Sequence, residues 1–387
     1  MKLRDLRFSG RRIATVVVTA AMAAATITVG TAHAVSVTKN LTYRCTFPLV
    51  GPQDVAATVQ ITFPDTGTTG ARIVNGDLSI VATLSANVVS ALRAFQTATT
   101  EGSAVADVDA SHLTNSFTLG VSGLKIAKQN VPASGTMPVQ ISGPTPSMIV
   151  YKAGNVVIKA GQQFNAKVDT RKANGQPTAL GVLNVPCTVK ATTPAQDLSL
   201  ATIPVTGADV TPPDQGTPAS GPVDKTLVYN CVFPQSGAVD VPGHITGTIP
   251  ATGTVNQRLQ PNLSIAATLP SSVADVLRAN SAATVSGSGQ ADADASYNGS
   301  NITVGIPGPV PSVAVPASGD LTATLAPSVP SLAVPAAGSI VLSAGQQLNG
   351  TFTPLKADGT PTALGTFSVP CTLNPGQNPA LGTIVVS

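Results

Sequence analysis

The chain has 387 residues, of which 43% are hydrophobic, 10% are charged and 3% are aromatic, with no tryptophan. This length and hydrophobic content fit two globular domains and argue against a disordered chain. The formal charge of +3 comes from the N-terminus, because the first 34 residues hold five of the 21 basic residues and one of the 18 acidic residues. The rest of the chain has a charge of −1, which gives no reason to expect nucleic acid as a partner.

An export signal is predicted at residues 1–34. A basic start is followed by a mostly apolar stretch at 13–29, and Ala32-His33-Ala34 fits the small-x-small cleavage rule. The dipeptide Arg11-Arg12 leaves twin-arginine export open beside general secretion. An uncleaved anchor is the alternative, but the apolar stretch is shorter than the ~20 residues that cross a bilayer. We therefore expect a secreted protein with no membrane span after cleavage, released or held noncovalently at the cell surface.

The four cysteines belong to one pattern that occurs twice. Leu-x-Tyr-x-Cys-x-Phe-Pro surrounds Cys45 and Cys231, and Val-Pro-Cys-Thr surrounds Cys187 and Cys371. Four cysteines allow three pairings, and the repeat favours Cys45–Cys187 and Cys231–Cys371. Disulfides persist in exported proteins, which agrees with the predicted signal. A buried free thiol is the alternative for each cysteine.

The repeat extends beyond the cysteines. Other phrases recur at offsets of 184 to 186 residues, among them Pro-Thr-Ala-Leu-Gly at 177–181 and 361–365. The two copies predict two domains, at 35–206 and 224–387. Residues 207–223 are rich in Pro, Gly and Asp, and we expect them to form a semi-stiff linker.

Each domain has the pattern of β-structure. Leu41, Tyr43, Cys45 and Phe47 alternate with polar residues, which is typical of a strand with one buried face. Turn residues interrupt the strands every 8 to 12 positions, as in a sandwich or a barrel. We predict an all-β fold of two tandem β-sandwich domains with immunoglobulin-like character, each stabilised by its own disulfide. Each is longer than an ordinary immunoglobulin domain and lacks tryptophan.

Two local signals also recur. Asn174-Gly175 and Asp358-Gly359 lie between apolar runs and predict hairpins. Apolar residues at helical spacing in 85–95 and 271–279 predict one short helix in each domain.

Signals for catalysis are weak. Beyond the predicted signal the chain has two histidines, His112 and His244, and neither recurs at the matching place in the other copy. A Ser-His-Asp arrangement would have to use one of them, whereas a surface or turn histidine is the simpler interpretation. Glu101 is the only glutamate, and no zinc-type His or Cys cluster or glycine-rich phosphate loop is present in the sequence. We therefore expect a noncatalytic protein without a cofactor.

One acidic pattern recurs, as Asp107-x-Asp109 and Asp292-x-Asp294. Alternate carboxylates are weak candidates for a calcium site, since calcium takes six to eight oxygen ligands. The glycine and the distal glutamate of a dedicated calcium loop are missing from the sequence. The alternative is that strand spacing places both acids of each pair on the solvent-exposed face.

Sugar binding commonly uses exposed aromatic faces, and the chain has no tryptophan. Tyr43 and Tyr229 share a face with the disulfide cysteines, so we expect them in the core. That leaves Tyr151 and Tyr297, which stand at positions that do not correspond between the copies.

Two other polar features recur. Arg93 and Arg278 end the predicted helices, where a cation stabilises the C-terminus, with a ligand contact as the alternative. Gln162-Gln163 and Gln346-Gln347 follow Ala-Gly in both copies, and we interpret them as polar residues that flank turns.

The two copies differ in charge. Residues 36–206 hold 12 basic and 8 acidic residues, whereas 207–387 hold 4 and 9. Opposite charges favour docking between the domains, head-to-tail association, or adherence of the first domain to an anionic wall polymer. Independent drift of the two surfaces is the alternative.

With its Leu-x-Tyr-x-Cys-x-Phe-Pro opening and Val-Pro-Cys-Thr closing phrases, the chain resembles an uncharacterised domain family of secreted actinobacterial proteins. The resemblance covers two copies and implies an exported β-rich domain, with no established activity and no functional residues to transfer.

We predict a noncatalytic extracellular protein that acts as a cell-surface or wall-associated binding or structural module. Its expected partner is a cell-wall polymer or another surface protein, and the oligomeric state is left open. The alternatives are a secreted hydrolase or hydrolase accessory domain acting on polysaccharide or peptide, and a calcium-dependent adhesion module.

Overall fold

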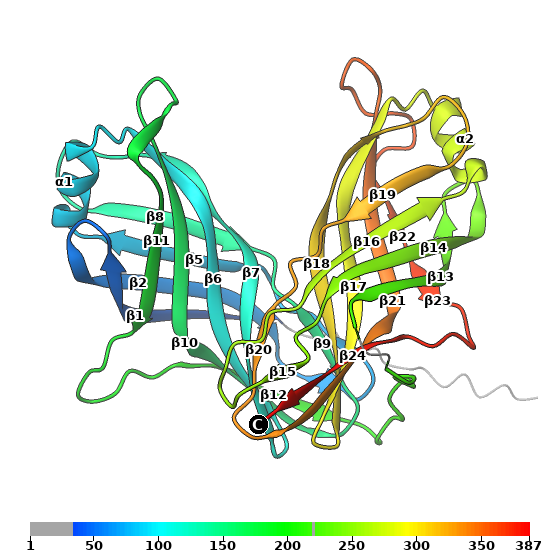
Figure 1. Cartoon of the computed structure of the whole chain (residues 1–387), viewed down its shortest axis with the longest axis horizontal. Coiled ribbons are helices and arrows are strands. Elements are labelled where there is room, and N and C mark those ends of the chain that lie inside the picture. Colours follow the sequence, from blue (N-terminus) through cyan, green and yellow to red (C-terminus); the bar gives the residue numbers. More distant parts are fainter. Residues whose placement is uncertain (1–33, 219–220) are drawn as a thin grey trace, which may run out of the picture. The chain divides into compact units, whose positions relative to one another are not determined.

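The computed structural model describes residues 34–218 and 221–387 (Figure 1). The predicted signal peptide, except for Ala34, lies outside the described residues. We call residues 34–206 the first repeat and residues 223–387 the second repeat. None of the helices in the described residues is long and apolar enough to span a membrane.

The first repeat contains twelve strands and one helix among the described residues. Their bounds are β1 (Ala34–Phe47), β2 (Gly51–Pro64), β3 (Gly67–Thr68), β4 (Arg72–Ile73), β5 (Leu78–Leu84), α1 (Ala86–Ala94), β6 (Thr99–His112), β7 (Asn115–Asn130), β8 (Met137–Gly143), β9 (Ser147–Val150), β10 (Gly154–Arg171), β11 (Pro177–Val189) and β12 (Ser199–Thr206).

The second repeat follows the same order, except that two short strands replace β11 and an isolated bridge between Leu259 and Leu332 replaces the pairing of β4 with β9. Its bounds are β13 (Val223–Phe233), β14 (Gly237–Thr248), β15 (Thr252–Gly253), β16 (Asn262–Leu269), α2 (Ser271–Ala279), β17 (Thr284–Tyr297), β18 (Ser300–Ala314), β19 (Leu321–Leu325), β20 (Ser331–Ala333), β21 (Gly338–Leu355), β22 (Phe367–Val369), β23 (Cys371–Leu373) and β24 (Ala380–Val386).

The first repeat is a closed barrel of eight strands. Hydrogen bonding runs in the order β1-β2-β5-β8-β7-β6-β10-β11, and β11 pairs back with β1. The predicted all-β class is confirmed, but the two-sheet immunoglobulin-like sandwich is not, because the ladder continues around the ring. A sandwich and a barrel both bury alternate residues along each strand, so the alternation in the sequence did not distinguish them.

The second repeat has the corresponding strand order, β19-β16-β14-β13-β23-β21-β17-β18. No ladder is assigned between its end strands β18 and β19. Just beyond β19, the N–H groups of Ala326 and Ser328 donate to the carbonyls of Pro309 and Pro307, at 3.1 and 2.9 Å. Proline has no N–H group, so these positions accept hydrogen bonds but cannot donate them.

The predicted helices are confirmed as α1 and α2, one in each repeat. Helix α1 buries Val88, Val89 and Leu92. Near its last turn, Arg93 Nη1 donates to the Val131 carbonyl at 3.5 Å, and Arg278 makes an equivalent bond to Pro316 at 2.9 Å. Both arginines therefore tie a helix end to a neighbouring loop of their own repeat.

Each disulfide joins two strands that are distant in the sequence. Cys45 on β1 lies directly opposite Cys187 on β11, and Cys231 on β13 lies opposite Cys371 on β23. These are the pairs that the repeat predicts. The cysteines of the first disulfide are 142 positions apart in the sequence and those of the second are 140 apart, so each disulfide spans nearly the whole of its repeat.

Removal of either disulfide is expected to destabilise its repeat. In the chain-entropy model, closing a loop of more than 100 residues contributes about 5 kcal/mol, and measured values are often smaller. The Cys45→Ala/Cys187→Ala and Cys231→Ala/Cys371→Ala variants should each unfold at a clearly lower urea concentration than the oxidised wild type. Reduced wild-type protein is the control, and an unchanged midpoint on reduction would contradict the prediction.

Candidate binding groove between the repeats

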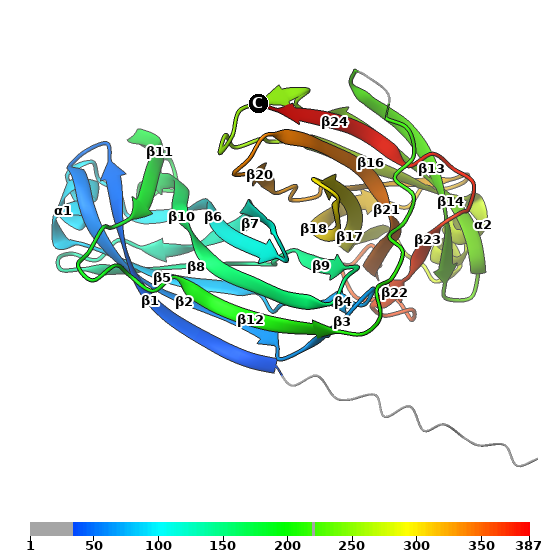
Figure 2. The same ribbon diagram turned by 90° about the horizontal axis from the view of Figure 1, so that it is seen from below.

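The two repeats exchange short strands. Strand β9 of the first repeat pairs with β18 of the second, and β20 of the second repeat pairs with β7 of the first (Figure 1). In the first repeat, β4 also pairs with β9, and β3 with β12 (Figure 2). Because β9 and β20 stand at corresponding places, the contact is self-complementary, like the interface of a twofold dimer.

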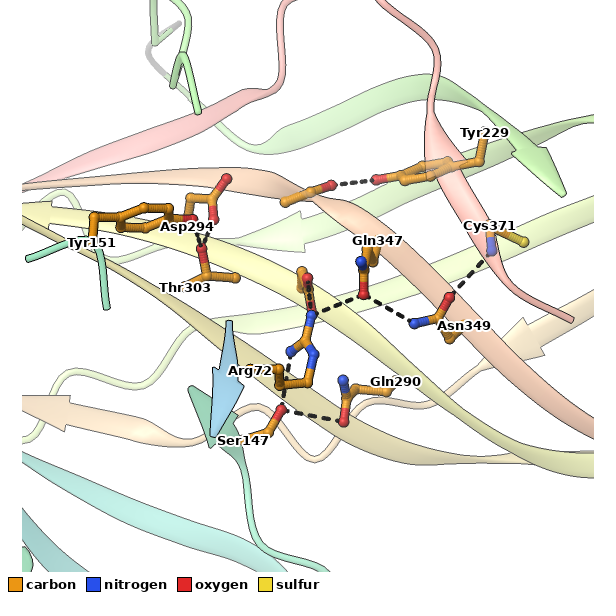
Figure 3. A network of polar contacts seen from close by, with 12 residues as sticks. Arg72, Ser147, Tyr151, Tyr229, Gln290, Asp294, Thr303, Gln347, Asn349 and Cys371 are labelled. Atoms are coloured by element: carbon orange, nitrogen blue, oxygen red, sulfur yellow. Dashed lines mark hydrogen bonds and ion pairs between the residues drawn. The ribbon is translucent and has the colours of Figure 1, made fainter. Parts of the chain in front are cut away.

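A buried ion pair lies beside the β9–β18 junction (Figure 3). Arg72 on β4 donates through Nη2 to Oδ2 of Asp292 on β17, at 2.5 Å. The same guanidinium donates to Ser147 Oγ and to Gln347 Oε1, both at 3.0 Å. Asp292 is 6% exposed, so the arginine of one repeat binds one oxygen of a carboxylate that the other repeat buries.

The corresponding ion pair lies beside the β7–β20 junction. Arg258 Nη2 approaches both carboxylate oxygens of Asp107, at 2.5 and 2.7 Å. Arg258 also donates to Ser331 Oγ at 2.6 Å and to Gln163 Oε1 at 3.3 Å. Each repeat thus supplies one arginine and one aspartate to the interface.

The local sequence makes room for these pairs. Gly161 lies in a bulge of β10 opposite Asp107, and a Cβ atom there would lie 2.4 Å from the Cβ of that aspartate. Gly345 stands in the same relation to Asp292, also at 2.4 Å. The glutamines that follow, Gln163 and Gln347, therefore lie in strand bulges and bind arginine. Their interpretation as residues that flank turns was wrong.

The four aspartates considered as calcium ligands are bound by arginine or threonine side chains of the protein. Asp107 and Asp292 are held by arginines, while Asp109 accepts from Thr118 Oγ1 at 2.5 Å. Asp294 accepts a hydrogen bond from Thr303. Within the described ranges, no group of three or more His, Cys, Asp or Glu is placed to hold a metal ion.

The solvent-exposed face predicted for these acids was wrong for three of them. Asp107, Asp292 and Asp294 are buried, because the other repeat covers the strand face on which they lie. Burial raises the pKa of Asp107 and of Asp292, while the paired arginine in each case acts in the opposite direction. Burial raises the pKa of Asp294 to about 6.

The two histidines lie apart, one in each repeat. His112 is buried at the end of β6, its Nε2 has no hydrogen-bond partner among the described residues, and burial lowers its pKa. His244 Nε2 lies 2.6 Å from Asp224 Oδ1 in an exposed pair. In the described part of the chain, no hydrogen bond joins either histidine to a serine hydroxyl.

A groove with a cavity volume of about 1010 Å³ opens between the two repeats. Its wall contains prolines and glycines of β7, β17 and β18, and Lys125 is the one charged residue among the described lining residues. Its hydroxyl and amide side chains come mostly from the second repeat: Ser103, Ser288, Gln290, Ser328, Gln347, Asn349, Thr351, Ser368 and Thr372.

The interface network orients the amides of this groove (Figure 3). Gln347 Oε1 accepts hydrogen bonds from Arg72 and, at 3.2 Å, from Asn349 Nδ2. Asn349 Oδ1 in turn accepts from the backbone N–H of Cys371 at 3.2 Å. The Gln347 amide nitrogen donates to no described residue, so it remains available as a donor to a ligand.

The sequence interpretation missed the two interface arginines. Arg72 and Arg258 recur at an offset of 186 residues, within the range of the other repeated phrases. Each is a charged residue beside an apolar one, in Arg72-Ile73 and Arg258-Leu259. Pairing each recurrent arginine with a recurrent aspartate would have suggested an interface.

The fold and the groove define a protein of two β-barrel-like repeats that exchange short strands, each repeat closed by its own disulfide. The chain belongs to the DUF6801 family, a family of unknown function, whose sequence profile matches residues 42–201 and 228–382. No curated protein matches the chain. The two disulfides are consistent with an extracellular location.

Loss of either interface arginine is expected to be strongly destabilising. Arg72→Met and Arg258→Met each leave a buried carboxylate without its partner, which typically costs about 3–5 kcal/mol. Urea unfolding should show the loss, and adding Asp292→Asn to Arg72→Met should recover part of it.

The matched control is Arg44→Met. Arg44 pairs with Asp54 at 2.8 Å, but both side chains are exposed. We expect little change in the unfolding midpoint of this variant. An Arg72→Met effect no larger than that of the control would contradict a stabilising role of the buried pair.

Asp294 is expected to make stability depend on pH. Its pKa is raised from 3.8 to about 6, so its contribution is fully present below pH 3.8 and is lost as the pH rises through 6. The shift corresponds to a loss of up to about 3 kcal/mol. Asp294→Asn should therefore gain stability relative to the wild type at pH 7.5 but not at pH 3.5, as measured by urea unfolding. An equal difference at both pH values would contradict the assignment.

Proposed function

We propose that the protein is a noncatalytic extracellular binding module that holds a neutral, polar surface polymer, such as a cell-wall polysaccharide, in the groove between its repeats. The observation that carries the proposal is the chemistry of the groove. Hydroxyl and amide side chains line it beside prolines, glycines and the apolar Leu124 and Val369, and Lys125 is the one charged residue among those described. Such groups match the hydroxyl groups of a sugar chain, which both donate and accept hydrogen bonds.

The size and rigidity of the groove support a polymer rather than a small molecule. A volume of about 1010 Å³ lies at the upper end of small-ligand pockets. The network through Arg72, Gln347 and Asn349 holds two of the lining amides in place. Side chains that are already ordered lose less conformational entropy when a ligand binds.

The positions of the polar groups favour binding over hydrolysis. His112 is buried in the first repeat, and the His244–Asp224 pair lies on an exposed surface of the second; neither histidine lines the groove. The described lining residues include no carboxylate that could act as a general acid or base. We therefore retain a noncatalytic role.

Co-sedimentation with isolated actinobacterial cell walls tests the proposal. Protein of residues 35–387 should be retained at low salt and at 1 M salt, because hydrogen bonds to a neutral polymer are less sensitive to screening than ion pairs. Ser288→Trp places a large ring at an exposed groove position on β17 and should lose most of the retention.

Thr322→Trp is the matched control, since Thr322 is exposed on β19 and does not line the groove. Equal retention of the two variants would refute binding in the groove. Retention that disappears at high salt would instead favour electrostatic adherence, as the difference in charge between the copies suggests. Absence of retention by the wild type would contradict wall binding.

A further inference from the structure

The two repeats carry the same polar pair at corresponding places, but only one pair is covered by a tyrosine. In the second repeat, Thr303 on β18 donates to Oδ1 of Asp294 on β17. In the first repeat, Thr118 on β7 donates to Oδ1 of Asp109 on β6, at 2.5 Å. Tyr151, which directly follows β9, reaches the pair in the second repeat.

The contact of Tyr151 with the Asp294–Thr303 pair shows which chemical group such a pair can bind (Figure 3). The Tyr151 hydroxyl lies 2.6 Å from Thr303 Oγ1 in a buried contact. Since Thr303 gives its only hydroxyl proton to Asp294, the tyrosine must be the donor. The polar end of the site is therefore a threonine oxygen that accepts a hydrogen bond from a phenol.

No tyrosine among the described residues covers the Asp109–Thr118 pair of the first repeat in this way. The residue that corresponds to Tyr151 is Pro335, and the backbone fixes the correspondence. The carbonyls of Val150 and Val334, one residue earlier, accept equivalent backbone hydrogen bonds at 2.9 and 2.8 Å. Proline is smaller than tyrosine and carries no hydroxyl group, and a cavity of about 280 Å³ lies beside Pro335.

This cavity has a polar and an apolar wall, and none of its lining residues belongs to the groove between the repeats. The polar wall includes Asp109, Ser111, Thr118 and Lys159, and the apolar wall includes Phe117 and Val157. Among the described residues, none donates a hydrogen bond to Thr118 Oγ1. Its lone pairs are therefore free to accept one.

We propose that the first repeat binds a phenolic ring in this cavity. The phenol hydroxyl donates to Thr118 Oγ1, which donates to Asp109, and this repeats the chain of hydrogen bonds that Tyr151 forms in the second repeat. The ring packs against Phe117 and Val157. A volume of about 280 Å³ suits a ligand of this size. The phenol is either a free small molecule or the tyrosine side chain of a partner protein.

Titration of the full mature chain, residues 35–387, with p-cresol tests the site. Binding is followed by ligand-observed NMR, and saturable binding of one equivalent is expected. Pro335→Tyr supplies the missing ring from within the chain and should abolish binding without lowering the melting temperature. Thr118→Val keeps the shape but removes the acceptor, and should weaken binding about tenfold, the effect of one hydrogen bond.

Thr303→Val is the matched control, because it removes the same hydroxyl from the occupied site; it should leave p-cresol binding unchanged. Toluene, which lacks the hydroxyl, should bind at least tenfold more weakly than p-cresol. Absence of saturable binding, or binding that survives both Pro335→Tyr and Thr118→Val, would overturn the proposal. A tyrosine-containing peptide distinguishes the sources: if it binds, the site accepts a partner's tyrosine, and if only p-cresol binds, the ligand is a free phenol.

Discussion

The arrangement of this molecule depends on a buried arginine–aspartate pair that is used twice. Taking a carboxylate out of water costs several kcal/mol, and the cost is offset only when a partner of opposite charge lies in good geometry. Asp107 and Asp292 find that partner only in the other repeat, in Arg258 and Arg72. Neither repeat alone supplies a partner for its buried aspartate, so the ion pairs form only when the two repeats are docked in this one arrangement. Glycines at the strand bulges, such as Gly161, let the acids approach the strand closely enough.

The two candidate sites, the groove between the repeats and the cavity beside Pro335, both lie near the contact between the repeats. A duplicated interface would be symmetric if the copies were identical, and both sites occur where they differ. Prolines on β18, including Pro307 and Pro309, interrupt the ladder of the second repeat beside the groove. Pro335 replaces the tyrosine that closes the equivalent place in the other repeat. Local sequence differences between two repeats of the same strand order thus accompany two separate concave sites.

The sequence predicted those features that depend on local pattern or on the repeat itself. Strand alternation, the short helices and the cysteine pairs were all correct. Closure of the barrel was not predictable, because it depends on which distant strands pair, for example β6 with β10 and β1 with β11. The role of Asp107 was missed for the same reason: its partner, Arg258, lies 151 residues away and on the other repeat.

The interface contacts bear on the difference in charge between the two repeats, which could act either in docking between the repeats or in adherence to an anionic polymer. Each repeat contributes one arginine and one aspartate, so the ion pairs of the interface are balanced. The positive excess of the first repeat and the negative excess of the second therefore lie outside these two ion pairs. The groove, with Lys125 as the one charged residue among its described lining, does not use the excess. Any electrostatic adherence of the first repeat would act through a different surface, and screening by salt would weaken that adherence while leaving hydrogen bonding in the groove largely intact.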